Sequence, residues 1–171
     1  MLRKFAYTLV ATGLIAGMAV AQEQSAEVIG GKGEKIGTVQ IKQGPHGIVL
    51  RIGLEKGALS PGWHGVHFHE HGDCSDHSEF TKSKGHINPE GKEHGFLNPK
   101  GPHPSDLPNI YAQADGSSQA EILVAGVSLS GGKVNLEDED GSAIIFHANP
   151  DDHLTQPIGG AGARVGCALI K

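Results

Sequence analysis

The segment at residues 47–55 alternates between apolar and other side chains with a period of two. Four aliphatic residues recur at every second position: Ile48, Leu50, Ile52 and Leu54. Successive side chains of a strand point to opposite faces, so this segment predicts a β-strand with one buried face. Residues 35–42 alternate in the same way, and the sequence QGPHG at residues 43–47 predicts a turn that joins the two strands into a hairpin.

No stretch of the chain carries an apolar stripe at helical spacing. Short segments of β-forming residues recur instead, separated by clusters of Gly, Pro, Asn and Asp. These segments are residues 63–69, 110–114, 119–124, 143–147 and 164–170. With 26 glycines and no long helix, the chain is expected to be all-β, either a sandwich or a barrel.

The first 21 residues have the pattern of a secretory signal peptide. A basic start (LRK, residues 2–4) precedes an apolar run at residues 5–20, and the small residues AVA at 19–21 form a cleavage motif. An uncleaved membrane anchor is the less favoured alternative, because the run is short for a bilayer and ends in that motif. We therefore divide the chain into a signal peptide (1–21), a flexible N-terminal lead (22–34) and one folded domain (35–171).

The charge of the exported chain limits its partners. Without Arg3 and Lys4, 12 of the 14 basic residues remain against 19 acidic ones, which gives a formal charge near −7. A surface of this sign argues against nucleic acid as a partner, and against stable association with an anionic membrane after cleavage.

The chain has two cysteines, Cys74 and Cys167. In an exported protein such a pair predicts one disulfide, because the compartment is oxidising. Two free buried thiols are the alternative. A bond between them would close a loop of 93 residues and stabilise the fold by roughly 4 kcal/mol in the chain-entropy estimate.

Histidines gather in the stretch HGVHFHEHGDC at residues 64–74, which holds four of the 11 in eight positions. On a strand His67 and His69 share one face, while Val66 and Phe68 face the core. The next segment, residues 73–109, is a long loop without a clear strand, and such loops in compact domains need something to order them. We expect the disulfide and bound metal to do so.

Further potential ligands follow along the chain: His86, His94, His103, Asp106 and His147. Imidazole suits copper and zinc, and a single carboxylate among imidazoles suits zinc better, so the set predicts two metal sites. The remaining histidines are expected to be surface residues or to lie behind the ligands: His46, His64, His71, His77 and His153.

Five motifs of the chain resemble the copper/zinc superoxide dismutases, particularly their exported bacterial branch. The motifs are GVHFHEHGDC (65–74), GHINP (85–89), EHGFLNPKGPHPSDLPN (93–109), FHANPDD (146–152) and GGAGARVGCALI (159–170). The resemblance implies an eight-stranded Greek-key β-barrel or sandwich with an immunoglobulin-like architecture. It also implies dismutation of superoxide to dioxygen and hydrogen peroxide by alternating Cu(II) and Cu(I), as a defence of the cell envelope in the periplasm.

The resemblance further implies a role for each site residue. Copper would be bound by His67, His69, His86 and His147, and zinc by His86, His94, His103 and Asp106, with His86 shared as a bridge that also takes a proton. Asp151 would link His67 to His94, and Arg164 would receive the anion over the copper.

The chain departs from the family pattern in three places. The stretch at residues 75–84 is slightly longer than in animal relatives, which bears on dimer contacts. Arg164 follows His147 by only 17 positions, too few for the charged segment of eukaryotic members, so Lys82, Lys84 and Lys100 are candidates for attracting the anion. Ser105 stands where the family usually has glycine. A homodimer is possible, and the oligomeric state is left open.

Two other functions are alternatives. A copper carrier on the same scaffold would bind metal without turnover, and a zinc hydrolase would need an H-E-x-x-H motif that the chain lacks.

Overall fold

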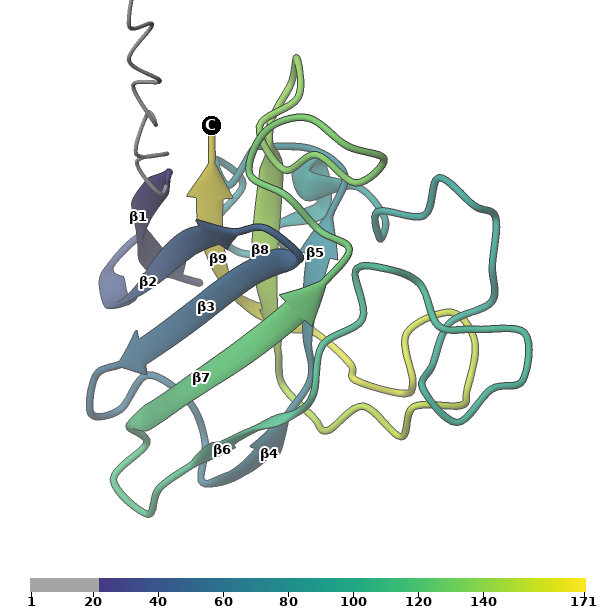
Figure 1. Ribbon diagram of the computed structural model, residues 1–171. Coiled ribbons are helices and arrows are strands. Elements are labelled where there is room, and N and C mark those ends of the chain that lie inside the picture. Colours follow the sequence, from purple (N-terminus) through teal and green to yellow (C-terminus); the bar gives the residue numbers. More distant parts are fainter. Residues whose placement is uncertain (1–21) are drawn as a thin grey trace, which may run out of the picture.

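The computed structural model describes residues 22–171, and this part of the chain is nearly all strand (Figure 1). The strands are β1 (Glu23–Gly30), β2 (Lys35–Gly44), β3 (Gly47–Leu54), β4 (Gly62–His64), β5 (Val66–His69), β6 (Ile110–Ala112), β7 (Ser118–Ala125), β8 (Ser142–His147) and β9 (Arg164–Ile170). One short 3-10 helix, η1, spans Thr81–Ser83. The predicted all-β class is confirmed.

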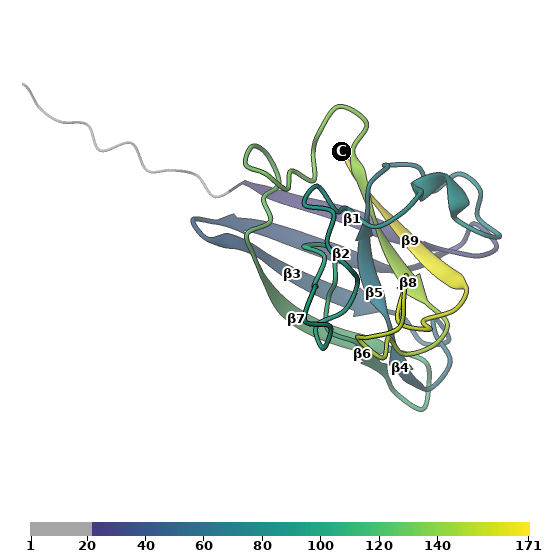
Figure 2. The ribbon, with the colours of Figure 1, turned by 90° about the vertical axis from the view of Figure 1, so that its right-hand side faces the viewer.

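Seven strands form one antiparallel sheet in the order β5-β8-β9-β1-β2-β3-β7, and β4 pairs with β6 in a second, smaller sheet. β1 pairs with β9 at only three positions, from Val28 opposite Ala168 to Gly30 opposite Gly166, so the sheet curls there. Figures 1 and 2 show the result, a sandwich with β1, β2, β3 and β7 in one layer and β5, β8 and β9 in the other.

The core lies between these two layers. The four aliphatic residues at alternate positions of β3 are all buried, as their period predicts. Phe68 of β5 and Phe146 of β8 meet them from the opposite layer and are also buried. The same β5 segment therefore presents Phe68 to the core and leaves its neighbouring histidines on the other face.

The segment predicted as one strand at 63–69 is interrupted at Gly65. Its N–H donates to the carbonyl of Asn149, and its carbonyl accepts from the N–H of His147, both at 2.9 Å. The halves on either side consequently pair with different strands, β4 with β6 and β5 with β8. Counted as one strand, β4 and β5 give the eight strands that were expected.

The prediction of a flexible lead at residues 22–34 is wrong. Residues 23–30 form β1, which pairs along its length with β2 and at its end with β9. The alternation was missed because Gln24 and Ala26 precede the buried Val28, so this face is weakly apolar in sequence. Pairing with two neighbouring strands, which no local pattern reports, decides its structure.

Two loops lie together on one side of the sandwich: residues 70–109, drawn in teal in Figure 1, and residues 148–163, drawn in yellow. The predicted disulfide is confirmed, and Cys74–Cys167 ties the first loop to β9 with its Cα atoms 5.8 Å apart. Around it Phe80, Ala143 and Ile145 form a small second core.

The predicted signal peptide lies outside the described residues. Within residues 22–171 there is no helix with the length and apolar character needed to cross a bilayer.

Candidate metal centre

Four buried or nearly buried histidines form the first cluster of the site: His67, His69, His86 and His147. β5 supplies the first two, and its antiparallel pairing with β8 brings them near His147 at the end of that strand. The long loop runs along the free edge of β5, where His86 forms an isolated bridge with His69. The strand pairing and the loop together bring the four rings into one place.

One nitrogen of each ring in this cluster has no hydrogen-bond partner among residues 22–171. The four nitrogens are His67 Nδ1, His69 Nε2, His86 Nε2 and His147 Nε2. Buried polar atoms are nearly always paired, because an unpaired one loses its hydration without compensation. Four such nitrogens within 4.8 Å of one another are the donor set that a transition metal binds.

In two of these rings, a hydrogen bond to the other nitrogen determines which nitrogen keeps a free lone pair. His69 Nδ1 lies 2.9 Å from the carbonyl of Lys84, and His147 Nδ1 lies 3.1 Å from that of Gly162. A carbonyl can only accept, so Nδ1 carries the proton in both rings and Nε2 keeps its lone pair. Such hydrogen bonds set the tautomer and the direction of a metal-binding ring.

Burial also keeps three rings of this cluster, those of His67, His69 and His147, neutral. It lowers the pKa of His67 to about 4 and that of His147 to about 3, and it holds the pKa of His69 well below its usual value. Neutral imidazole is the form that binds metal, so these rings are ready as ligands at pH 7.

The second cluster contains His86, His94, His103 and Asp106. The carboxylate oxygen Oδ1 of Asp106 lies 2.9 Å from His94 Nδ1, 3.2 Å from His86 Nδ1 and 3.5 Å from His103 Nδ1. Three imidazole nitrogens and one carboxylate oxygen around one point fit a tetrahedral zinc site.

Hydrogen bonds hold Asp106 ionised. Burial alone would raise its pKa, but bonds from His86, His94 and the N–H of Gly95 lower it well below its usual range. Its second oxygen, Oδ2, accepts the N–H groups of Gly95 and His103 at 2.9 and 3.0 Å. Ser105 beside it is buried, and its carbonyl accepts the N–H of Phe68, so the backbone here is well anchored.

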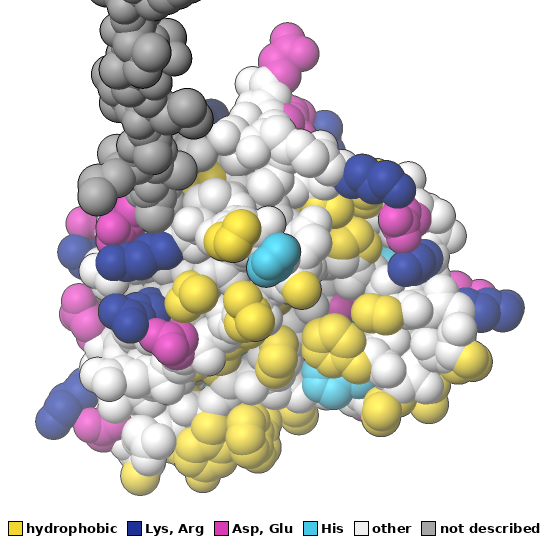
Figure 3. Space-filling view, viewed as in Figure 1, with side chains coloured by type: hydrophobic (Ala, Val, Ile, Leu, Met, Phe, Trp, Pro, Cys, Tyr) yellow, Lys and Arg dark blue, Asp and Glu magenta, His cyan; other side chains and the backbone are white. Residues whose placement is uncertain are grey.

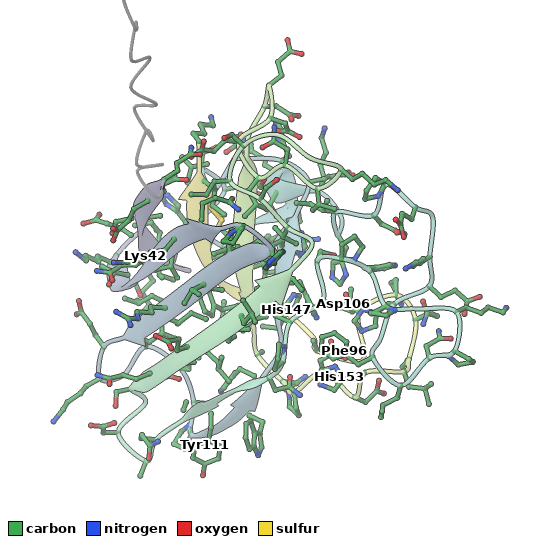
Figure 4. The ribbon with its side chains drawn as sticks, in the orientation of Figure 1. Lys42, Phe96, Asp106, Tyr111, His147 and His153 are labelled. Atoms are coloured by element: carbon green, nitrogen blue, oxygen red, sulfur yellow. A yellow bond between two sulfur atoms is a disulfide. The ribbon has the colours of Figure 1, made fainter. Side chains whose placement is uncertain are left out.

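His86 belongs to both clusters, with Nε2 in the first and Nδ1 in the second. The centre of its ring lies 4.2 Å from that of His67 and 5.3 Å from that of His103. The two clusters are therefore adjacent and share one imidazole. In Figure 4, His147 of one cluster and Asp106 of the other lie inside the molecule, between the sheet and the loops.

Asp151 links the two clusters through hydrogen bonds to one ring of each. Its Oδ2 lies 2.7 Å from His67 Nε2, and its Oδ1 lies 3.0 Å from His94 Nε2. Burial opposes ionisation, but these two bonds lower the pKa of Asp151 well below its usual range. Burial lowers the pKa of His94, but the hydrogen bonds from its ring to Asp106 and Asp151 outweigh burial and raise that pKa to about 9.

Arg164 begins β9 directly opposite His147. Its guanidinium makes three hydrogen bonds to the loop segment that precedes His86: Nη1 to the carbonyl of Phe80 at 2.7 Å and to Ser83 Oγ at 3.0 Å, and Nη2 to the carbonyl of Lys84 at 2.7 Å. The guanidinium is thus fixed beside the first cluster.

The three candidate lysines differ in their surroundings. Lys82 donates to Ser75 Oγ at 2.8 Å, and Lys100 pairs with Glu93 at 2.9 Å. The Lys84 ammonium is exposed and has no hydrogen bond or ion pair within residues 22–171.

Two of the other histidines lie beside the site. His64 is buried, with Nδ1 2.7 Å from the carbonyl of His147 and Nε2 2.7 Å from that of Ser60. His153 lies beside Phe96 (Figure 4), with ring centres 5.0 Å apart and ring planes tilted by 38°, and its backbone N–H donates to Asp151 Oδ1.

Sequence reasoning missed several residues that hold the centre in place: Phe80, Ser83, Asn109 and Gln156. Asn109 and Gln156 contact the backbone of Asp151 and His94, which are 42 and 62 positions away along the chain. No local pattern could reveal such partners.

Comparison with known proteins gives a consistent result. The family description "Copper/zinc superoxide dismutase" matches residues 35–170. The chain is 49% identical over 150 residues to a Cu-Zn superoxide dismutase from Caulobacter vibrioides, covering 86% of this chain and 84% of the relative. It is 40% identical over 156 residues to one from Aquifex aeolicus, covering 89% and 90%.

Solved structures share the fold. A superoxide dismutase-like protein from Bacillus subtilis superimposes with a TM-score of 0.81 at 38% identity, covering 86% of this chain and 97% of that one. The Cu/Zn superoxide dismutase from Brucella abortus gives a TM-score of 0.68 at 27% identity, covering 88% and 100%.

Proposed function

Because this chain belongs to the copper/zinc superoxide dismutase family, an enzyme family that converts superoxide to dioxygen and hydrogen peroxide, we propose that the two clusters are its copper and zinc sites. The first cluster takes copper, through the four nitrogens that lack partners. The second takes zinc, through three imidazoles and the carboxylate of Asp106. The four free nitrogens are the single observation that carries this assignment.

Copper, when bound, supplies the one-electron redox couple that zinc, with no accessible second oxidation state, cannot supply. The chain supplies the geometry. Nδ1 of His69 and of His147 is held by a backbone carbonyl, so each ring can rotate little and its Nε2 stays directed into the cluster.

We assign to His86 the transfer of a proton to the reduced product of superoxide. Its Nδ1 is held in the second cluster, next to Asp106, while its Nε2 faces the first. Nε2 can carry a proton only while it is not binding copper; that proton would then point to the place where the anion arrives, and it could be donated to the reduced product on its way to hydrogen peroxide.

Arg164 receives the anion. Its three hydrogen bonds to the loop use part of the guanidinium and fix its direction, so the remaining N–H groups are available to superoxide. A protein with a formal charge near −7 repels an anion on average, so attraction has to be local. Of the three candidate lysines, Lys84 is the one whose ammonium has no hydrogen bond or ion pair within the part of the chain that the structure describes.

The competing function is a copper carrier without turnover. The chain retains all four nitrogens of the first cluster and Arg164, and a carrier would have no use for an anion-binding arginine. Metal analysis and superoxide decay on residues 22–171 decide between the two functions. Decay that requires bound copper supports the enzyme, whereas a copper-loaded protein without activity supports the carrier.

We also propose that the protein is exported to the periplasm and defends the cell envelope there. The signal-like residues 1–21 and the disulfide support this proposal. Fractionation of the producing cells, with N-terminal sequencing of the protein, tests it: a chain that starts at Gln22 in the periplasmic fraction is expected, and an intact chain in the cytoplasm would refute it.

A homodimer stays a prediction. Hydrophobic side chains gather over the end of β7 and the adjoining loop on the face shown in Figure 3. Leu123 of β7 is exposed, and so are Phe96 and Leu97 of the first loop. Light scattering on the purified chain tests the oligomeric state.

A further inference from the structure

The two loops that supply the centre are joined by two side-chain amides, one from each loop. Gln156 of the second loop donates from Nε2 to the carbonyl of His94 at 2.8 Å, and its Oε1 accepts the N–H of His94 at 2.9 Å. Asn109 of the first loop donates from Nδ2 to the carbonyl of Asp151 at 2.8 Å, and its Oδ1 accepts the N–H of Asp151 at 2.8 Å.

Each amide therefore binds both polar groups of one backbone residue. A side-chain amide has the same donor and acceptor as a peptide group, so such a pair of bonds resembles one step of strand pairing. Two bonds fix the orientation of a residue as well as its position, which a single bond does not. The two contacts are reciprocal, since each loop holds one residue of the other.

The two residues held in this way, His94 and Asp151, help to form or to orient both clusters. His94 contributes Nδ1 to the second cluster, and Asp151 bonds to one ring of each cluster. The side chains of His94 and Asp151 also bond to each other, which makes a third link between the loops. A shift of either backbone would move this pair away from the metal positions.

Within residues 22–171, neither side-chain amide makes a hydrogen bond to a strand of the sandwich. The other side-chain bonds of Gln156 and Asn109 are to the carbonyl of Leu154 at 2.9 Å and to His153 Nε2 at 3.3 Å, both within the second loop. Loss of either amide should therefore disturb the centre locally and leave the sheet largely unaffected.

We propose that Gln156 and Asn109 are positioning residues that set the affinity and geometry of the zinc site by fixing His94 and Asp151 across the two loops. The proposal rests on the assignment of the second cluster to zinc. It adds a role for two residues that touch neither metal position nor substrate.

The test uses Gln156→Glu and Asn109→Asp in the metal-loaded protein. Each change keeps the shape of the side chain and replaces its N–H donor with an oxygen, which repels the carbonyl it faces. We expect zinc release to a chelator to accelerate by about 10- to 100-fold, the range seen when outer hydrogen bonds of metal ligands are lost. Cobalt(II) placed in the zinc site should show a changed visible spectrum, because its spectrum reports ligand geometry.

Gln43→Glu is the matched control. Gln43 also accepts a backbone N–H, that of Leu129 at 2.7 Å, and donates to a backbone carbonyl, that of Gly47 at 3.1 Å, but these belong to two different residues and lie away from both clusters. It should release zinc at the parent rate. Gln156→Ala and Asn109→Ala, which remove the amide without adding charge, give a second measure should a charged variant fail to fold.

Zinc release and a cobalt spectrum unchanged in the alanine and acidic variants would overturn the proposal. So would an equal acceleration in Gln43→Glu, because that would show general loosening. The outcome is separable from the proposed function. If the parent protein lacks dismutase activity and the Gln156 and Asn109 variants still release zinc faster than the parent, the positioning role is supported and the function is refuted.

Discussion

Arg164 and His69 share one hydrogen-bond acceptor, the carbonyl oxygen of Lys84, which lies 2.7 Å from Arg164 Nη2 and 2.9 Å from His69 Nδ1. A single peptide group of the long loop thus fixes both the guanidinium proposed to receive the anion and a ring of the first cluster. Lys84 itself has a φ of 61°, a left-handed conformation that is costly for a residue other than glycine. The two bonds to its carbonyl hold it there.

Two substitutions of Lys84 should distinguish the effect of its strained backbone on stability from the effect of its charge on the rate; the first is Lys84→Gly. Glycine adopts a positive φ freely, so we expect the protein to gain about 1 kcal/mol in unfolding free energy. Loss of the ammonium should lower the rate of superoxide decay at low salt. Lys84→Gln removes the charge and keeps the strain, so it should lower the rate equally without the gain in stability. An unchanged rate in both variants at low salt would show that Lys84 does not attract the anion.

Arg164→Ala should slow dismutation and weaken inhibition by small anions. A hydrogen bond to a charged group contributes roughly 1.5–3 kcal/mol, so we expect an effect on the order of tenfold or more. Arg164→Lys should recover only part of it, because one ammonium cannot satisfy the three acceptors that the guanidinium reaches. The rate constant and the inhibition constant for azide are the measurements, and parent values for both in Arg164→Ala would contradict the assigned role.

His147→Ala should abolish dismutation while the zinc site keeps its metal. His147 contributes to the first cluster alone, whereas His86 contributes to both. Metal content and superoxide decay are measured together, with the exposed His46→Ala as the control that should behave as the parent. Full activity in copper-loaded His147→Ala would refute the copper assignment.

Asp151→Ala should weaken binding at both metal sites, since Asp151 bonds to His67 in one cluster and His94 in the other. Loss of such outer bonds typically lowers metal affinity by about 10- to 100-fold. Competition with chelators, run separately for copper and zinc, measures the effect. A loss confined to one metal would show that only one of the two bonds matters.

Cys74→Ser should destabilise the fold by up to about 4 kcal/mol, because Cys74–Cys167 closes a 93-residue loop and anchors it against Phe80. Thermal unfolding measures the change, and the parent with its disulfide reduced should lose a similar amount. Unaltered thermal stability in both would show that the bond contributes nothing to the fold.

The fold was largely predictable from the chain because its strands are amphipathic. The alternation in β3 appears as a buried face, and the long loop identified at residues 73–109 contains only η1. β1 was missed since its buried face starts with Gln24 and Ala26, and the break at Gly65 was missed because it arises from bonds to the distant Asn149 and to His147.

The sequence by itself determined which side chains were available and which of them share a strand face: the pairs on β5, the spacing of ligands along the loop, and the two cysteines. These are local properties, set by the period of the backbone and by side-chain chemistry. Only the tertiary structure decided which nitrogen of each ring faces inward and that Gln156 and Asn109 join the loops. Those facts depend on contacts between residues many positions apart, and such contacts exist only once the sheet has curled and brought the two loops to the same side.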